Sequence, residues 1–125
     1  MRGIKFRVWD GEEMLSLSEA YHLDLVFIQE NKSSFQIEKL FEGIKLMQYT
    51  GLKDKEGQEI YEGDIAKLNY SSIGFRHTIK GIIVFDKGAY LFNSENIRFE
   101  RLLGNCNDIK LIGNKYENTE LVEEL

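Results

Sequence analysis

The chain has 125 residues, of which 42% are hydrophobic and 30% are charged, and its net charge is −5. This length and apolar content suit one folded domain with a single core, and the charge balance excludes both a disordered acidic chain and a strongly basic nucleic-acid-binding protein. The longest purely apolar runs have four residues, far below the roughly 20 that span a bilayer, so no transmembrane helix is expected.

Alternation of apolar and polar residues with a period of two predicts β-strands along most of the chain. Residues 4–9 (IKFRVW) predict the first strand, and Asp10-Gly11 predicts a hairpin turn into residues 13–15. Residues 23–28 (LDLVFI) and 34–38 (SFQIE) predict a second hairpin around a polar loop.

The second half of the chain predicts five more strands. Residues 44–50 (IKLMQYT) predict a strand that ends at Gly51, and residues 63–70 (GDIAKLNY) predict the next one. A hairpin is predicted from residues 77–92, with its turn at Asp86-Lys87-Gly88. Residues 108–113 (DIKLIG) predict the final strand.

Helical signals are confined to three short segments. Residues 16–23 and 93–103 each have a polar cap candidate and some apolar spacing, so each is expected either as a short helix or as a loop with one helical turn. The acidic end, residues 117–125, is expected either as a short helix or as a loose end.

The chain contains no proline, so glycine and asparagine must form its turns. Many short strands joined by tight turns favour a small barrel or sandwich over an alternating α/β design. We therefore predict a mainly β fold with one or two short helices, formed by a single domain over residues 1–125.

Motifs for catalysis or metal binding are absent from the sequence. No histidine has a second ligand at a known zinc spacing, and neither GxSxG nor GxxxxGK[ST] occurs. The loop DKEGQE, which begins at Asp54, lacks the spacing of an EF-hand, and a charged reverse turn explains it. The sequence therefore predicts no metal, no cofactor and no catalytic residue.

Three carboxylates would be the candidates if the protein were an unrecognised hydrolase. Glu59, Glu62 and Asp64 could act with His77, provided that the fold gave the carboxylates different pKa values. The simpler interpretation is that the two glutamates keep a sheet edge in water and that Asp64 accepts hydrogen bonds from backbone N–H groups in its turn.

Charge is distributed unevenly along the chain, with −5 in residues 1–65, +4 in residues 66–115 and −4 in the last ten residues. The basic part predicts a surface for RNA or single-stranded DNA, because phosphates attract cations and bases stack on exposed rings such as Tyr70 and Phe75. Its candidate binding residues are Lys67, Arg76, Lys80, Lys87, Tyr90, Arg98 and Arg101. The alternative is that the rings form the buried faces of strands and the lysines the exposed ones.

The amino end and the cysteine content indicate the compartment. Charges at Arg2, Lys5 and Arg7 leave no uninterrupted apolar segment for a secretory signal. The chain has no second cysteine with which Cys106 could form an internal disulfide or bind a metal ion through two thiolates, and this fits a reducing cytoplasm. The side chain of Cys106 is expected to be buried or half-buried.

Three blocks of the sequence carry a resemblance to a known family: residues 4–10 (IKFRVWD), 46–65 (LMQYTGLKDKEGQEIYEGDI) and 112–121 (IGNKYENTEL). With these blocks the chain resembles, over essentially its whole length, the YopX family of small proteins encoded by bacteriophages and prophages. The resemblance implies a small SH3-like barrel in residues 44–125, with an N-terminal strand region in residues 1–43 packed on it, in the bacterial cytoplasm. It implies no catalytic residue, because the family has no established activity.

We interpret the central block, residues 48–65, as a structural corner. Its large side chains are expected to be buried, and its glycines to take backbone angles that other residues resist. The corner residues are Tyr49, Gly51, Leu52, Gly57, Ile60, Tyr61, Gly63 and Asp64.

The leading functional hypothesis is a non-enzymatic module that binds a host or phage macromolecule, most simply a protein, because small β-barrels expose edges and loops to partners. Binding of RNA or single-stranded DNA through residues 66–115 is the alternative, and an unrecognised hydrolase is the second. Sheet edges also permit pairing between copies of the chain, although lysines and glycines near the strand ends oppose it.

Overall fold

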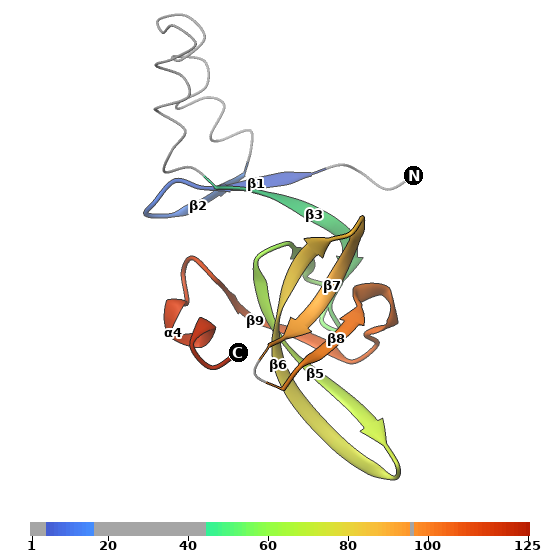
Figure 1. Cartoon of the computed structure of the whole chain (residues 1–125). Coiled ribbons are helices and arrows are strands. Elements are labelled where there is room, and N and C mark those ends of the chain that lie inside the picture. Colours follow the sequence, from blue (N-terminus) through green and yellow to red (C-terminus); the bar gives the residue numbers. More distant parts are fainter. Residues whose placement is uncertain (1–4, 17–44, 96) are drawn as a thin grey trace, which may run out of the picture. The chain divides into compact units, whose positions relative to one another are not determined.

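The structure is a computed structural model of the full chain, and it describes residues 5–16, 45–95 and 97–125. Strands and turns make up nearly all of these residues, which confirms the prediction of a mainly β fold (Figure 1). The chain divides into two compact units, Gly3–Gln48 and a unit that includes Tyr49–Leu125. The hairpin predicted over residues 23–38 lies outside the described residues, as does nearly all of the segment 16–23.

The described part of the first unit is a small antiparallel sheet. Strand β1 (Phe6–Trp9) pairs with β2 (Met14–Ser16) on one side and with the first residues of β3 (Lys45–Lys53) on the other. The predicted turn between β1 and β2 is present, because one carboxylate oxygen of Asp10 accepts hydrogen bonds from the N–H groups of Glu12 and Glu13, each at 2.8 Å. These N–H groups lower the pKa of Asp10.

In the second unit, the end of β3 pairs with the short strand β4 (Glu59–Tyr61), and five further strands form an antiparallel sheet in the order β8-β7-β6-β5-β9. The strands of this sheet are β5 (Asp64–Ser72), β6 (Phe75–Asp86), β7 (Ala89–Ser94), β8 (Phe99–Leu102) and β9 (Ile109–Asn114). A 3-10 helix, η2 (Leu103–Asn105), and a short helix, α4 (Thr119–Val122), complete the unit. The SH3-like character of the barrel and the packing of the N-terminal strands on it stay predictions.

The core of the second unit lies on one face of the five-stranded sheet. Alternate residues of β5 and β6 point into it, since successive side chains of a strand face opposite sides. The buried cluster consists of Ile60, Ala66, Leu68, Ile79, Ile83, Phe92, Leu103, Cys106 and Ile109. Ile60 brings β4 into this core, and the burial of Cys106 agrees with its expected place.

Three elements differ from the sequence prediction. Strand β3 does not end at Gly51 but continues to Lys53. The segment 93–103, expected as a helix or a loop with a helical turn, contains β8, because the pairing of Phe99 with Ser94 supplies hydrogen bonds that its own sequence pattern does not indicate. Strand β4 was not predicted. The acidic end forms the short helix α4, which is one of the two alternatives predicted for it.

Gly81 in β6 lies where two strands leave no room for a side chain. A Cβ atom at this position would meet the ring of Phe92 at 2.6 Å and the carbonyl oxygen of Asn93 at 2.8 Å. Phe92 is fully buried, so its ring has no free space into which to move. The core therefore requires glycine here.

We expect Gly81→Ala to lower the free energy of unfolding by about 1–3 kcal/mol, because overpacking forces neighbouring side chains off their preferred positions. Urea unfolding followed by circular dichroism measures this loss. Gly104→Ala is the matched control, since a Cβ atom there meets nothing within 4 Å. Equal unfolding midpoints for the two variants would contradict the close packing of Gly81.

Candidate functional site

Strands β5 and β6 extend beyond the rest of their sheet as a two-stranded arm (Figure 1). Strand β9 pairs with β5 as far as Leu68, and β7 pairs with β6 from Ile82 onward. From Asn69 to Thr78, β5 and β6 pair with each other, and in the described part of the chain neither β9 nor β7 pairs with these residues. We call residues 69–78 the arm.

The register of the arm separates its side chains into two faces. Tyr70 pairs with His77, two residues beyond the buried pair Leu68 and Ile79, so these four side chains share one face. Phe99 and Arg101 of β8 contact Tyr70 on this side. We call this surface the aromatic face; its residues are Tyr70, Phe75, His77, Phe99 and Arg101.

The rings of the aromatic face form a continuous series that begins in the core. Fully buried Phe92 contacts Phe99 edge to face, with 6.0 Å between ring centroids. Phe99 lies 5.2 Å from Tyr70, and Tyr70 stacks on His77 at 4.9 Å with an angle of 28° between the ring planes. Because His77 is exposed, the series ends with a ring that a partner can reach.

A guanidinium group lies over this series. The Cζ atom of Arg101 is 5.4 Å from the ring centroid of Tyr70 and 5.1 Å from that of Phe99. Such cation–π contacts hold the planar group against the rings. The preceding residue, Glu100, accepts a hydrogen bond of 3.1 Å from the side-chain amide of Asn93, and alternation along β8 puts its carboxylate on the other side of the sheet.

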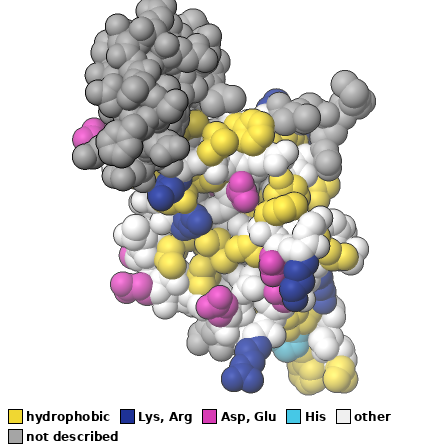
Figure 2. Space-filling view, turned by 45° about the horizontal axis from the view of Figure 1, so that its top comes forward, with side chains coloured by type: hydrophobic (Ala, Val, Ile, Leu, Met, Phe, Trp, Pro, Cys, Tyr) yellow, Lys and Arg dark blue, Asp and Glu magenta, His cyan; other side chains and the backbone are white. Residues whose placement is uncertain are grey.

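The tip of the arm is apolar, exposed and conformationally strained. Ile73 and Gly74 form the two-residue turn, with φ values of 52° and 76°, and a branched residue is disfavoured at such angles. Ile73 is 93% exposed and Phe75 is 69% exposed. Figure 2 shows hydrophobic side chains in yellow beside the cyan histidine at the lower right, where the arm ends.

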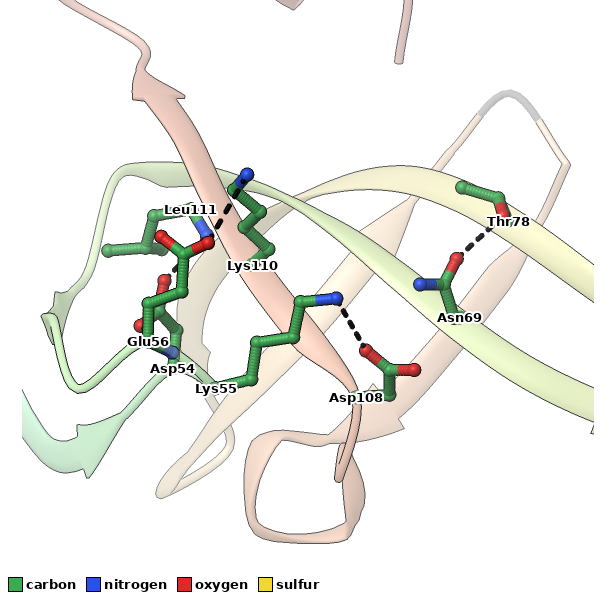
Figure 3. A network of polar contacts seen from close by, with 8 residues as sticks. All are labelled: Asp54, Lys55, Glu56, Asn69, Thr78, Asp108, Lys110 and Leu111. Atoms are coloured by element: carbon green, nitrogen blue, oxygen red, sulfur yellow. Dashed lines mark hydrogen bonds and ion pairs between the residues drawn. The ribbon is translucent and has the colours of Figure 1, made fainter.

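The opposite, polar face of the arm borders an open hollow of about 230 Å³. The polar-face residues at the hollow are Asn69, Ser71, Arg76 and Thr78, and Tyr70, His77 and Asp108 complete its lining. The hydroxyl of Thr78 donates a hydrogen bond of 2.6 Å to the amide oxygen of Asn69, so the polar groups there partly satisfy each other (Figure 3).

A row of lysines crosses the sheet next to the arm. Lys67 of β5 pairs directly with Lys110 of β9 and with Lys80 of β6. The two outer lysines form ion pairs, Lys80 with Glu124 at 2.8 Å and Lys110 with Glu56 at 3.4 Å. Carboxylates therefore neutralise much of the charge of this row.

The structure distributes the binding residues predicted from the sequence over several places. Lys67 and Lys80 belong to the lysine row, Arg76 borders the hollow, and Arg101 lies on the aromatic face. The remaining three are elsewhere: Lys87 in the turn between β6 and β7, Arg98 in the turn before β8, and Tyr90 with its ring packed on the core and 4.9 Å from Phe85.

The sequence prediction gave no weight to Ile73, and it did not count His77 among the binding residues. Gly74 lies between two segments of alternating residues, a pattern that predicts a hairpin turn and could have located Ile73 at its tip. The prominence of His77 depends on its register with Tyr70, and no local pattern reveals that register.

The residues considered for a hydrolase do not meet in one cleft. Asp64 begins β5, whereas His77 pairs with Tyr70, six residues further along that strand, a separation of about 20 Å at the rise of a strand. The Oδ2 atom of Asp64 accepts a hydrogen bond from the N–H of Tyr61 at 2.8 Å. Within the described ranges, no group of three His, Cys, Asp or Glu side chains could hold a metal ion.

The block interpreted as a corner contains buried, half-buried and exposed positions. Gly51, Gly57 and Gly63 have φ values of 85°, 85° and 89°. Ile60 and Asp64 are buried, and the rings of Tyr49 and Tyr61 lie 5.5 Å apart. Leu52, however, is 37% exposed, against the expectation of burial, because the register of β3 with β4 shifts between Tyr49 and Lys53.

Asp54 joins this block to β9. Its Oδ1 atom accepts hydrogen bonds of 2.9 Å from the N–H groups of Glu56 and Gln58, and its Oδ2 atom accepts one of 3.0 Å from Leu111 (Figure 3). Burial raises the pKa of the Asp54 carboxyl, but these three N–H groups and the charge of Lys110 outweigh it, so the pKa lies below its ordinary value of 3.8.

We expect Asp54→Asn to lower the free energy of unfolding at neutral pH by about 1–3 kcal/mol, because the NH2 group of an amide replaces one accepting oxygen and leaves a part-buried N–H group without an acceptor. A carboxyl with a lowered pKa stabilises the fold above its ordinary pKa, and this contribution disappears as the pH falls through the folded-state pKa. The stability of the variant should therefore decrease less steeply than that of the wild type below about pH 4. Urea unfolding at a series of pH values measures both effects.

Asp108→Asn is the matched control for this experiment. Asp108 is half-exposed and pairs with Lys55 at 3.2 Å, and an exposed ion pair contributes less than about 1 kcal/mol. Equal pH dependence in Asp54→Asn and the wild type would show that the Asp54 carboxylate does not connect the block to β9.

The profile of the YopX protein family matches residues 5–123 of the chain. Two solved structures share its fold. Protein EF1440 from Enterococcus faecalis is 24% identical with a TM-score of 0.62, and the match covers 98% of this chain and 99% of that chain. Protein yopX from Bacillus subtilis is 19% identical with a TM-score of 0.58, covering 97% and 98% of the two chains. No curated protein matches the chain.

Proposed function

The chain belongs to the YopX protein family, and on that basis we propose that it is a non-enzymatic module that binds a macromolecule through its arm. The family resemblance supports an origin in a phage or prophage and action in the cytoplasm of the bacterial host. In the described part of the chain, no helix is long and apolar enough to cross a membrane.

The strained and exposed tip of the arm is the observation that carries this proposal. Asparagine or glycine would be the favoured residue at the first position of such a turn, and a branched residue costs about 1–2 kcal/mol there. Ile73 nevertheless occupies it and is 93% exposed. Strain that the fold does not need is a mark of functional sites, and burial against a partner would offset it.

The construction of the arm supports the same conclusion. The aromatic face is anchored to the buried ring of Phe92 through Phe99, so the arm presents its side chains from a rigid base. Rigid aromatic and arginine side chains dominate the binding energy of many interfaces, because little conformational freedom is lost when they bind. The separation of His77 from Asp64 gives no comparable support to a hydrolase.

Affinity capture tests the proposal. We expect the immobilised wild type to retain a specific macromolecule from a lysate of induced prophage-carrying bacteria, and Ile73→Asn/Phe75→Ser to lose it. Removing two interface anchors costs about 2 kcal/mol or more of binding energy. The double variant should melt no lower than the wild type, because asparagine tolerates the backbone angles of the turn.

Ile97→Ser is the matched control, since Ile97 is 54% exposed but lies outside the arm. It should retain the same macromolecule as the wild type. The proposal is wrong if the arm variant retains the partner equally well, or if the wild type retains nothing above the level of an unrelated protein.

A further inference from the structure

We infer that the aromatic face binds an unpaired strand of nucleic acid, with bases stacked on its rings and a phosphate near Arg101. This inference rests on the proposed function, for which it names the class of partner. Four observations on the described residues lead to it: the geometry of the rings, the position of Arg101, the charge of the β5–β6 hairpin and the pairing of the lysines.

The stacked pair of Tyr70 and His77 is a preformed platform for a base. The two rings lie 4.9 Å apart and nearly parallel, and His77, the outer ring, is exposed. Phe75 is 69% exposed and follows the same face toward the tip. A sheet surface with rings on neighbouring strands is a common way to stack successive unpaired bases.

The charge of this region suits an anionic partner. The hairpin from residue 65 to residue 85 contains no aspartate or glutamate that would repel a phosphate, in a chain whose net charge is −5. Its own cations, Lys67, Arg76 and Lys80, alternate onto the polar face. On the aromatic face itself, Arg101 holds its guanidinium over Tyr70 and Phe99. The planar guanidinium group presents several N–H donors to phosphate oxygens and also stacks on bases.

The lysine row is a weaker candidate for the same partner. Glu124 and Glu56 neutralise Lys80 and Lys110, so the two ends of the row offer little free positive charge. Binding that depends on stacking rather than on a lysine surface should show a modest dependence on salt, because few counterions are released. The aromatic face and the lysine row are therefore separable by experiment.

An unpaired strand fits this face better than a duplex. In a duplex both faces of each base are covered by neighbouring bases, whereas an unpaired base can lie flat on a protein ring. Stacking of this kind tolerates any sequence, because every base has a π-face. We therefore expect little sequence preference, and the rings themselves give no reason to distinguish RNA from DNA.

Fluorescence polarisation with labelled oligo(dT) and oligo(U) of about 12 nucleotides, and with a duplex of the same length, tests the inference. We expect both single strands to bind and the duplex to bind at least about tenfold more weakly. His77→Ala should weaken binding of the single strands about tenfold, because one stacking contact is lost. Folding of each variant is checked by its thermal melt.

Two controls locate the site. Thr78→Ala changes the neighbour of His77 on the polar face of the arm, and Lys67→Ala removes the central charge of the lysine row. Both should bind within about twofold of the wild type. Preference for the duplex, or equal binding by His77→Ala and Thr78→Ala, would overturn the inference, as would the absence of binding to either single strand at low salt.

The capture experiment separates failure of this inference from failure of the proposed function. A protein that the wild type retains and the arm variant loses would leave the proposed function intact and refute nucleic acid as the partner. If the wild type and the arm variant retain a macromolecule equally well, both the proposed function and this inference are wrong. Nuclease treatment of the captured material, with and without protease, identifies its class.

Discussion

The antiparallel ladder between β5 and β6 is the constraint on which the second unit depends. It runs without interruption from Ile65 and Ile82 to Ser72 and Phe75, closed by the two-residue turn at the tip. This one register puts Leu68 and Ile79 into the core and, two residues further on, Tyr70 and His77 onto the aromatic face. A slip of one residue would turn every one of these side chains to the opposite face.

The β5–β6 ladder decides which face each side chain occupies. Hydrogen bonds and packing around Asp54 connect β4 and β9 to this ladder. Asp54 is 6% exposed, and both its oxygens accept hydrogen bonds from backbone N–H groups, including that of Leu111 in β9. Ile60 brings β4 into the same core. Thr50 adds a buried hydrogen bond of 2.8 Å to the carbonyl oxygen of Ile60. Together these contacts connect strands that are far apart in the sequence.

The proposed site differs from the rest of the surface because it continues the core outward. The ring of Phe92 has no exposure, and the series passes through the half-buried rings of Phe99 and Tyr70 to the exposed ring of His77. A site built in this way loses little conformational entropy on binding, since its rings are already ordered. The lysine row next to it lacks this support, because exposed lysines are flexible and those at its two ends are already paired with glutamates.

Local patterns in the sequence were enough for the mainly β fold, for most of the strands, for the family and for the turns at Asp10-Gly11 and Lys87-Gly88. Alternation and turn chemistry are local properties, so neighbouring residues contain the information. The pairing of β9 with β5, the strand β8 and the exposure of Leu52 depend on contacts between distant segments.

The candidate site also depends on such contacts. The sequence identified Arg101 and Tyr70 as candidates, but the tertiary structure separated Arg101 from the lysines and placed it over Tyr70. The physical reason is that register and strand order, which no local pattern encodes, decide which face a side chain occupies and which neighbours it meets.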